Sequence, residues 1–178
     1  PERVLELMAL SAQKHLKKEG DVDSQNGPWK LSLDIPTYTA FMSYAEDSLL
    51  REKLYKAFVS RASYGDENNS QIIEEILTLR TKQSKLLGYD SWADLSLSTK
   101  MAGKIENVEK LLEELREPSF KAAELELENL NKFAYKNGFN LDSQLKPWDI
   151  SYWSELLRKE ELNLDQEALR PWFPLEDV

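Results

Sequence analysis

The only histidine of the chain, His15, is the first residue to weigh for catalysis or metal binding. A helical zinc hydrolase needs two histidines one turn apart with a glutamate between them. A Ser/His/Asp triad would also have to use His15, and no serine has the glycine-flanked context of a nucleophile elbow. Lys14 and Lys17 lie close in sequence and disfavour a cation beside the imidazole. We therefore interpret His15 as a solvent-facing residue of a helix.

Carboxylates are the next candidates, because a pair of them can perform acid/base chemistry when burial drives their pKa values apart. The examples in the second half of the chain are Glu113, Glu114, Glu124, Glu126 and Glu128. Their helical neighbours are mostly polar, so a solvated helix face is the better interpretation. The loop with Asp21, Asp23, Asn26 and Gly27 is similar to a calcium loop, but it lacks the distal bidentate glutamate, and we interpret it as a turn.

Aromatic side chains could line a peptide groove, since they supply large and rigid contact areas. The most notable are Trp29, Trp92, Trp148, Tyr152 and Trp153. Core packing is the preferred role for most of them. Apolar and polar residues alternate from Trp29 to Asp34, which predicts a short strand. Its edge could accept an extended peptide or pair with another strand, and both interpretations stay open.

The composition restricts the function classes. The 178 residues are 41% hydrophobic and 31% charged, which is typical of a globular helical protein. A net charge of -9 repels phosphate backbones and anionic lipids, so we expect neither a nucleic-acid nor a membrane partner. The absence of cysteine excludes disulfides and thiolate chemistry. No signal peptide is visible, and we expect a cytoplasmic or organellar protein (mitochondrial matrix or chloroplast stroma) that is not secreted.

The elements that would position these residues are mostly helices, because apolar residues recur at helical spacing along the chain. We predict helices over residues 2–18, from Pro36, after Asp47, over Ile72 to Leu87, over Trp92 to Lys100, from Ile105 to near Gly138, and from Pro147. Ser91 and Asp94 have the spacing of a capping box, and Gly88 stands where a helix should end. Pro118 should kink the longest helix or divide it. The predicted fold class is all-α, mainly helical with one or two short strands.

Five ordered blocks of sequence carry a family resemblance. They are residues 26–36, 50–63, 86–102, 146–153 and 169–175, which include Asn-Gly-Pro-Trp, Leu-Leu-Gly-Tyr, Lys-Pro-Trp-Asp-Ile and Arg-Pro-Trp-Phe-Pro. In this order and spacing the chain resembles the thimet oligopeptidase and oligopeptidase A family of zinc peptidases. The resemblance extends over essentially residues 1–178.

The resemblance implies a helical lobe of a two-lobed zincin-type peptidase that hydrolyses short unstructured peptides, with spent targeting peptides among them. It implies a zinc held by two histidines of an HExxH helix and a later glutamate. None of these family residues matches a position in this chain, so we expect no catalytic, cofactor-binding or metal-binding residue here. Zinc would belong to the parent enzyme and not to this segment.

We therefore expect residues 1–178 to be one helical fragment of a larger peptidase. Residues 1–25 would end a preceding helical region, and residues 26–178 would form a channel wall that leads towards the zinc helix. Both ends look cut from a longer chain, so the expected partners are short peptides and the remainder of the same polypeptide, and the fragment should self-associate. The alternative is a non-enzymatic, all-helical peptide-binding or scaffold module.

Overall fold

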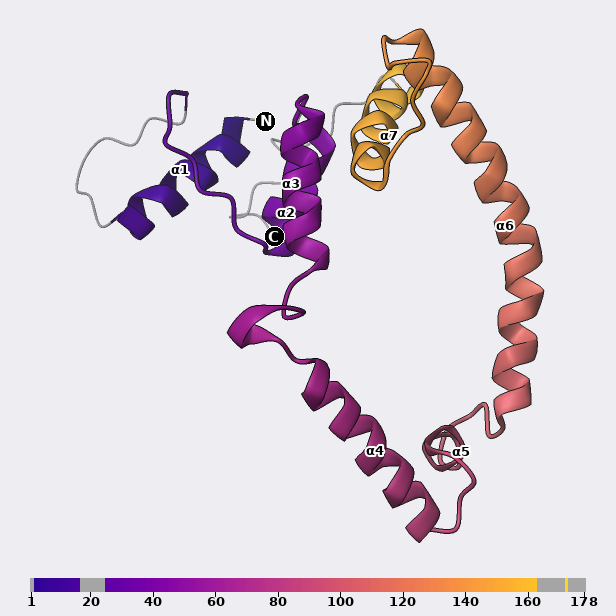
Figure 1. Cartoon of the computed structure of the whole chain (residues 1–178). Helices are drawn as coiled ribbons and strands as arrows, with labels where there is room; N and C mark the ends of the chain where they lie inside the picture. Colours follow the sequence, from indigo (N-terminus) through magenta and orange to yellow (C-terminus); the bar gives the residue numbers. More distant parts are fainter. Residues whose placement is uncertain (1, 17–24, 163–171, 173–178) are drawn as a thin grey trace. The chain divides into compact units, whose positions relative to one another are not determined.

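The computed structural model describes residues 2–16, 25–162 and 172, with only the backbone described at residues 2, 3, 7 and 13–16. The chain divides into two compact units. The first combines residues 1–59 with residues 129–178, and the second contains residues 60–128. Two segments that are distant in sequence thus build the first unit, and Figure 1 labels the helices of both units.

The first unit is made of helices. They are α1 (Glu2–Leu16), α2 (Ile35–Tyr44), α3 (Ser48–Val59), the C-terminal end of α6 (Ile105–Lys136) and α7 (Pro147–Leu162). Helix α7 packs against both α2 and α3, and α2 in turn contacts α1 and α3. The helix predicted over residues 2–18 is confirmed up to Leu16, and residues 17 and 18 lie outside the described part.

Polar residues and prolines set where these helices begin. Asp34 caps α2, since its carboxylate accepts from the backbone N–H of Thr37 at 3.0 Å, and Pro36 occupies the first turn. Asp47 does the same for α3, where its carboxylate accepts from the N–H groups of Leu49 (2.8 Å) and Leu50 (3.1 Å). The helix starts predicted at Pro36 and Pro147 and after Asp47 are therefore confirmed.

The core of the first unit lies where α6 meets α7. Leu130, Ala134 and Trp153 are buried there, and the rings of Phe133 and Phe139 meet the Trp153 ring edge-on at 6.3 and 5.9 Å between centroids. Aliphatic side chains such as Ile150, Leu156 and Leu157 complete this cluster. The interpretation of Trp153 as a core residue is confirmed.

The strand predicted from Trp29 to Asp34 is wrong. Residues 28–33 are extended but belong to no strand, and the described part of the chain contains only an isolated bridge at Gly27. The backbone N–H of Lys30 donates to the carbonyl of Met8, which lies in α1, at 3.0 Å. A strand requires a ladder of bonds to a neighbouring strand, whereas this segment runs beside a helix. The all-helical fold class is confirmed, without its strands.

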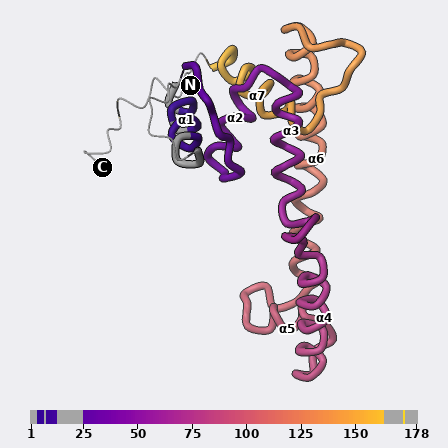
Figure 2. Tube along the Cα trace, turned by 60° about the vertical axis from the view of Figure 1, so that its left-hand side comes forward, coloured from indigo at the N-terminus to yellow at the C-terminus, as the bar shows by residue number. Residues whose placement is uncertain are grey.

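The second unit contains the short 3-10 helix η1 (Gly65–Glu67), α4 (Ser70–Leu86), α5 (Trp92–Leu97) and the larger part of α6. Helix α5 lies beside the C-terminal end of α4, as Figures 1 and 2 both show. The Arg80 guanidinium of α4 stands 5.2 Å from the centre of the Trp92 ring of α5. Ser84, near the C-terminal end of α4, is fully buried. Gly88 has φ +81°, which lets the chain turn sharply after α4.

The capping box predicted at the start of α5 is also present. The Ser91 hydroxyl accepts from the Asp94 N–H at 3.1 Å and donates to the Asp94 carboxylate at 2.7 Å. The helix ends at Leu97 and not at Lys100 as predicted, because the chain turns at Ser98 and the Lys100 N–H bonds to the carbonyl of Leu97.

Helix α6 is not divided by its proline. It runs as one helix from Ile105 to Lys136 with Pro118 in its interior, and Figure 1 shows the uninterrupted coil. Proline removes one backbone donor and crowds the preceding turn, but the flanking residues are mostly Leu, Glu, Ala and Lys, which are strong helix formers. Their summed preference outweighs a single breaker.

We expect the contribution of Asp34 to stability to disappear in acid. The Ser32 hydroxyl, followed by the Thr37 N–H, donates to the carboxylate and holds the pKa of Asp34 below its usual range. A depressed pKa in the folded state means that the stabilisation is present above the unfolded pKa and is lost as pH falls through the folded one. Thermal unfolding between pH 7 and about pH 3 should show the advantage of the wild type over Asp34→Asn shrinking. A difference that is constant over this range would contradict the prediction.

Replacing Pro118 should stabilise α6. Pro118→Ala restores the missing N–H and removes the steric crowding, so we expect a gain of about 1 to 3 kcal/mol in the free energy of unfolding. Urea unfolding followed by circular dichroism at 222 nm measures it, with Ser119→Ala as the neighbouring control that should change stability by only a few tenths of a kcal/mol. A loss of stability in Pro118→Ala would show that the proline fits a bend that the fold requires.

Candidate functional site

The most deeply buried polar side chains of the first unit are Arg51 and Asp149, each only 2% exposed. Arg51 lies on α3 and Asp149 lies in the first turn of α7, and their side chains form a salt bridge with 2.7 Å between Nη2 and Oδ1. Charged groups are almost never buried this completely unless they are paired. This pair is therefore the first candidate for a functional site.

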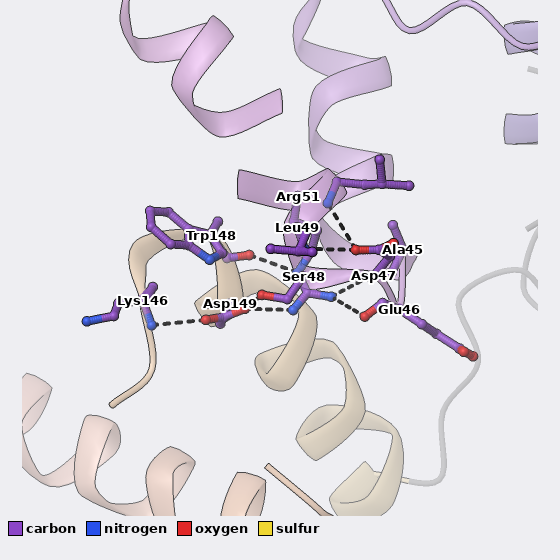
Figure 3. A network of polar contacts seen from close by, with 10 residues as sticks. Ala45, Glu46, Asp47, Ser48, Leu49, Arg51, Lys146, Trp148 and Asp149 are labelled. Atoms are coloured by element: carbon purple, nitrogen blue, oxygen red, sulfur yellow. Dashed lines mark hydrogen bonds and ion pairs between the residues drawn. The ribbon is translucent and has the colours of Figure 1, made fainter. Parts of the chain in front are cut away.

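The Arg51 guanidinium uses each of its nitrogens. Nε donates to the carbonyl of Trp148 at 3.0 Å, and Nη1 donates to the carbonyls of Ala45 (2.5 Å) and Glu46 (2.9 Å). These two carbonyls lie in the turn between α2 and α3, so a single side chain ties that turn to the start of α7 (Figure 3). The Tyr152 ring covers one face of the guanidinium, 4.4 Å from ring centre to Cζ.

Asp149 is satisfied on both oxygens. Oδ1 accepts from Arg51 and from the Ser48 hydroxyl at 2.7 Å, and Oδ2 accepts from the backbone N–H of Lys146 at 3.1 Å. The bond to Lys146 closes the first turn of α7 in the manner of a capping box, and Pro147 fits the same turn. One carboxylate thus caps α7 and fixes α3 against it.

This arrangement holds helices together and leaves nothing for a substrate. A general acid or base must keep a proton site within reach of a reacting group, and a metal ligand must point a lone pair into an open position. Here the strong donors of Arg51 and both oxygens of Asp149 are engaged within the network. We conclude that the network is a structural joint and not a catalytic centre.

The candidate glutamates of α6 are exposed, and two of them lie in ion pairs, which supports the solvated-face interpretation. Glu113 accepts from Arg116 at 2.5 and 2.8 Å, and both side chains are 64% exposed. The Arg116 guanidinium holds the pKa of the Glu113 carboxyl below its usual range, whereas a general acid needs a raised pKa. Glu114 pairs with Lys110 at 3.9 Å in the same helix. Glu124, Glu126 and Glu128 are exposed as well.

Several of the remaining candidates lie outside the described part of the chain. His15 lies on α1, but its side chain is outside the described residues, as are Asp21 and Asp23 of the loop similar to a calcium site. In the first unit, the Trp148 ring packs against Tyr55 at 5.8 Å between centroids. In the second unit, the Arg80 guanidinium stands over the Trp92 ring. Trp29 is 46% exposed.

No group of three or more histidine, aspartate or glutamate side chains within the described part of the chain could hold a metal ion. None of the helices described is both long and apolar enough to cross a membrane.

The sequence reasoning missed the joint between Arg51 and Asp149, although both residues stand in the blocks that carry the family resemblance. A signal was present, because Asp149 occupies the third position of the helix that begins at Pro147, and Arg51 is a cation within an otherwise apolar helix stripe that includes Leu54. Their 98-residue separation hides the pairing from any local pattern.

Removing one partner of this joint should destabilise the first unit strongly. Arg51→Met leaves the Asp149 carboxylate buried without its cation, and we expect a loss of about 3 to 5 kcal/mol in the free energy of unfolding. Urea unfolding followed by tryptophan fluorescence measures the loss. The double variant Arg51→Met/Asp149→Leu should lose less than the sum of the single changes, because both charges are then gone.

The matched control is the exposed pair of Lys56 and Glu52 on the same helix, with 2.5 Å between Nζ and Oε1. Glu52→Gln should cost at most about 1 kcal/mol, because exposed ion pairs contribute little. If Arg51→Met were no more destabilising than Glu52→Gln, the joint would not have the structural role assigned to it.

Comparison with known proteins places the chain. Residues 41–178 match the model of peptidase family M3. The chain is 41% identical over 172 residues to Organellar oligopeptidase A, chloroplastic/mitochondrial, of Arabidopsis thaliana. This alignment covers 96% of the present chain and 22% of the Arabidopsis protein. It is 41% identical to the Probable cytosolic oligopeptidase A of Arabidopsis thaliana (96% of this chain, 24% of that protein). The chain is 38% identical to Oligopeptidase A of Escherichia coli, in an alignment that covers 94% of this chain and 25% of that protein.

The chain thus spans about a quarter of the length of the curated relatives it matches. The resemblance to the thimet oligopeptidase and oligopeptidase A family is confirmed, because the family model covers most of the chain and the relatives agree with it. The chain belongs to peptidase family M3.

Proposed function

We propose that this chain is a segment of a zinc-dependent oligopeptidase that hydrolyses short unstructured peptides. The proposal rests on the extent of the similarity to an oligopeptidase. The alignment covers 96% of this chain but only 22% of a relative named as an oligopeptidase. A segment of that size contributes part of a peptidase. The scaffold alternative has no comparable support.

The role of this segment in the enzyme would be structural. Residues 1–25 would end a preceding helical region, and residues 26–178 would form part of a channel wall, with the joint of Arg51 and Asp149 keeping α2, α3 and α7 in register. Rigid walls support catalysis by holding the groups of the site in position. The substrates would be short peptides, with spent targeting peptides among them, in an organelle or the cytosol.

The residues of this chain do not fit a zinc site of the kind expected for such an enzyme. The whole chain has one histidine and no cysteine, so it cannot provide two imidazoles to a metal. Bound zinc would polarise the peptide carbonyl and activate water for its attack. We therefore assign the ligands and the general base to the part of the enzyme outside this chain, and we derive no chemical step from these residues.

The isolated chain should be inactive. We expect no hydrolysis of a quenched fluorescent peptide and no zinc retained after dialysis, because the necessary ligands are missing. Light scattering at high concentration should show self-association, because apolar helix faces are exposed. Chelator-sensitive cleavage by the purified chain would contradict the prediction, and a strictly monomeric species would contradict the expected association.

A chimera provides the positive test. Replacing the matching 172 residues of the Arabidopsis organellar protein by this chain should give a folded, chelator-sensitive peptidase, with the unaltered Arabidopsis protein as its control. If the chimera folds with a cooperative thermal transition but cleaves no peptide, the chain does not function as a peptidase segment.

A further inference from the structure

One apolar stripe follows α6 along its length. Its members recur every three or four residues, which places them on one face of the helix. They are Ile105, Val108, Leu112, Leu115, Ser119, Ala123, Leu127, Leu130 and Ala134. The stripe contains no charged residue, whereas the remaining positions of α6 carry all of its glutamates and lysines.

The C-terminal end of this stripe is covered by side chains of α7 and of the loop between α6 and α7. Leu130 is 6% exposed and Ala134 is fully buried, and both pack in the cluster around Trp153 of α7. At this end, therefore, the stripe is an established packing surface of the first unit.

The same stripe is exposed nearer its N-terminal end at Leu112 and Leu115, beyond the half-buried Ile105 and Val108. Leu112 is 60% exposed and Leu115 is 54% exposed, although they continue the face that is buried at Leu130. Exposed leucines at helical spacing along a long helix form the kind of contiguous apolar surface that marks an interaction site. On the other side of α6, Lys110 and Glu114 form an exposed ion pair of the kind suited to contact with water.

We infer that the part of the stripe formed by Leu112 and Leu115 is the docking surface for a helix from the part of the M3 polypeptide that lies outside this chain. The inference rests on the proposed function, in which this chain is a segment of a longer enzyme. Three observations favour this occupant over others. The stripe continues an apolar face that is buried at Leu130 and Ala134, its spacing suits a helix as partner, and the relatives are about four times as long as the matched segment.

The absence of cysteine makes a direct test possible, because an introduced thiol is unique within this segment. Four single variants are placed in the chimera with the Arabidopsis organellar protein and in the isolated chain: Leu112→Cys and Leu115→Cys on the stripe, and Lys110→Cys and Glu114→Cys on the opposite side. The probe is a maleimide at micromolar protein concentration, and peptide mass spectrometry separates each thiol from those of the Arabidopsis part. All four side chains are more than half exposed in this structure, so the two stripe positions and the two control positions start from similar exposure to solvent.

We expect all four thiols to react at similar rates in the dilute isolated chain. In the chimera, the thiols at 112 and 115 should react at about one tenth of their rates in the isolated chain or more slowly still, since covered sites react only through local opening. The thiols at 110 and 114 should keep their rates. Equal reactivity of all four positions in a folded chimera would overturn the inference. Protection of 112 and 115 that grows with chimera concentration would also overturn it, because the occupant would then be a second copy.

Peptidase activity of the same preparations separates this inference from the proposed function. An active chimera with unprotected leucine positions would refute the docking surface and leave the function standing. An inactive chimera that folds and protects these positions would support the docking surface and refute the function.

Discussion

The buried salt bridge between Arg51 and Asp149 is the interaction on which the first unit depends. It joins two parts of the chain that are separated by 98 positions, and it places a full positive charge and a full negative charge where water is excluded. Such a pair stabilises a fold only when every remaining donor and acceptor is satisfied. Here the backbone carbonyls at the end of α2 and the first turn of α7 supply those partners, so the charges specify which helix ends meet.

The apolar contacts around this joint are modest in extent. The cluster of Leu130, Ala134 and Trp153 is compact, while large apolar side chains along α4 and the N-terminal half of α6 remain exposed. Burial of apolar area is the main driving force of folding, so a segment with this much exposed apolar surface is poorly stabilised by itself. Those exposed side chains belong to the second unit, whereas the first unit has both the polar joint and an apolar cluster to hold its helices together.

The local features of the fold were predictable because they depend on neighbouring residues. The capping box of Ser91 and Asp94, the turn at Gly88 and the helix start at Pro147 each arise from interactions within about one turn. The segment from Trp29 to Asp34 was mispredicted because alternation indicates one buried face but not what lies beside it, and a helix lies there. Pro118 does not divide α6, since the preference of a long run of helix formers outweighs one residue.

The sequence by itself determined the helical class, the family and the lack of a second histidine for a metal site, because composition and ordered motifs need no tertiary contact. Only the tertiary structure decided that Arg51 and Asp149 meet, and that the α6 stripe is buried at Leu130 but bare at Leu112. Burial and long-range pairing depend on which segments approach one another. Periodicity along a single helix therefore cannot tell a covered leucine from an exposed one.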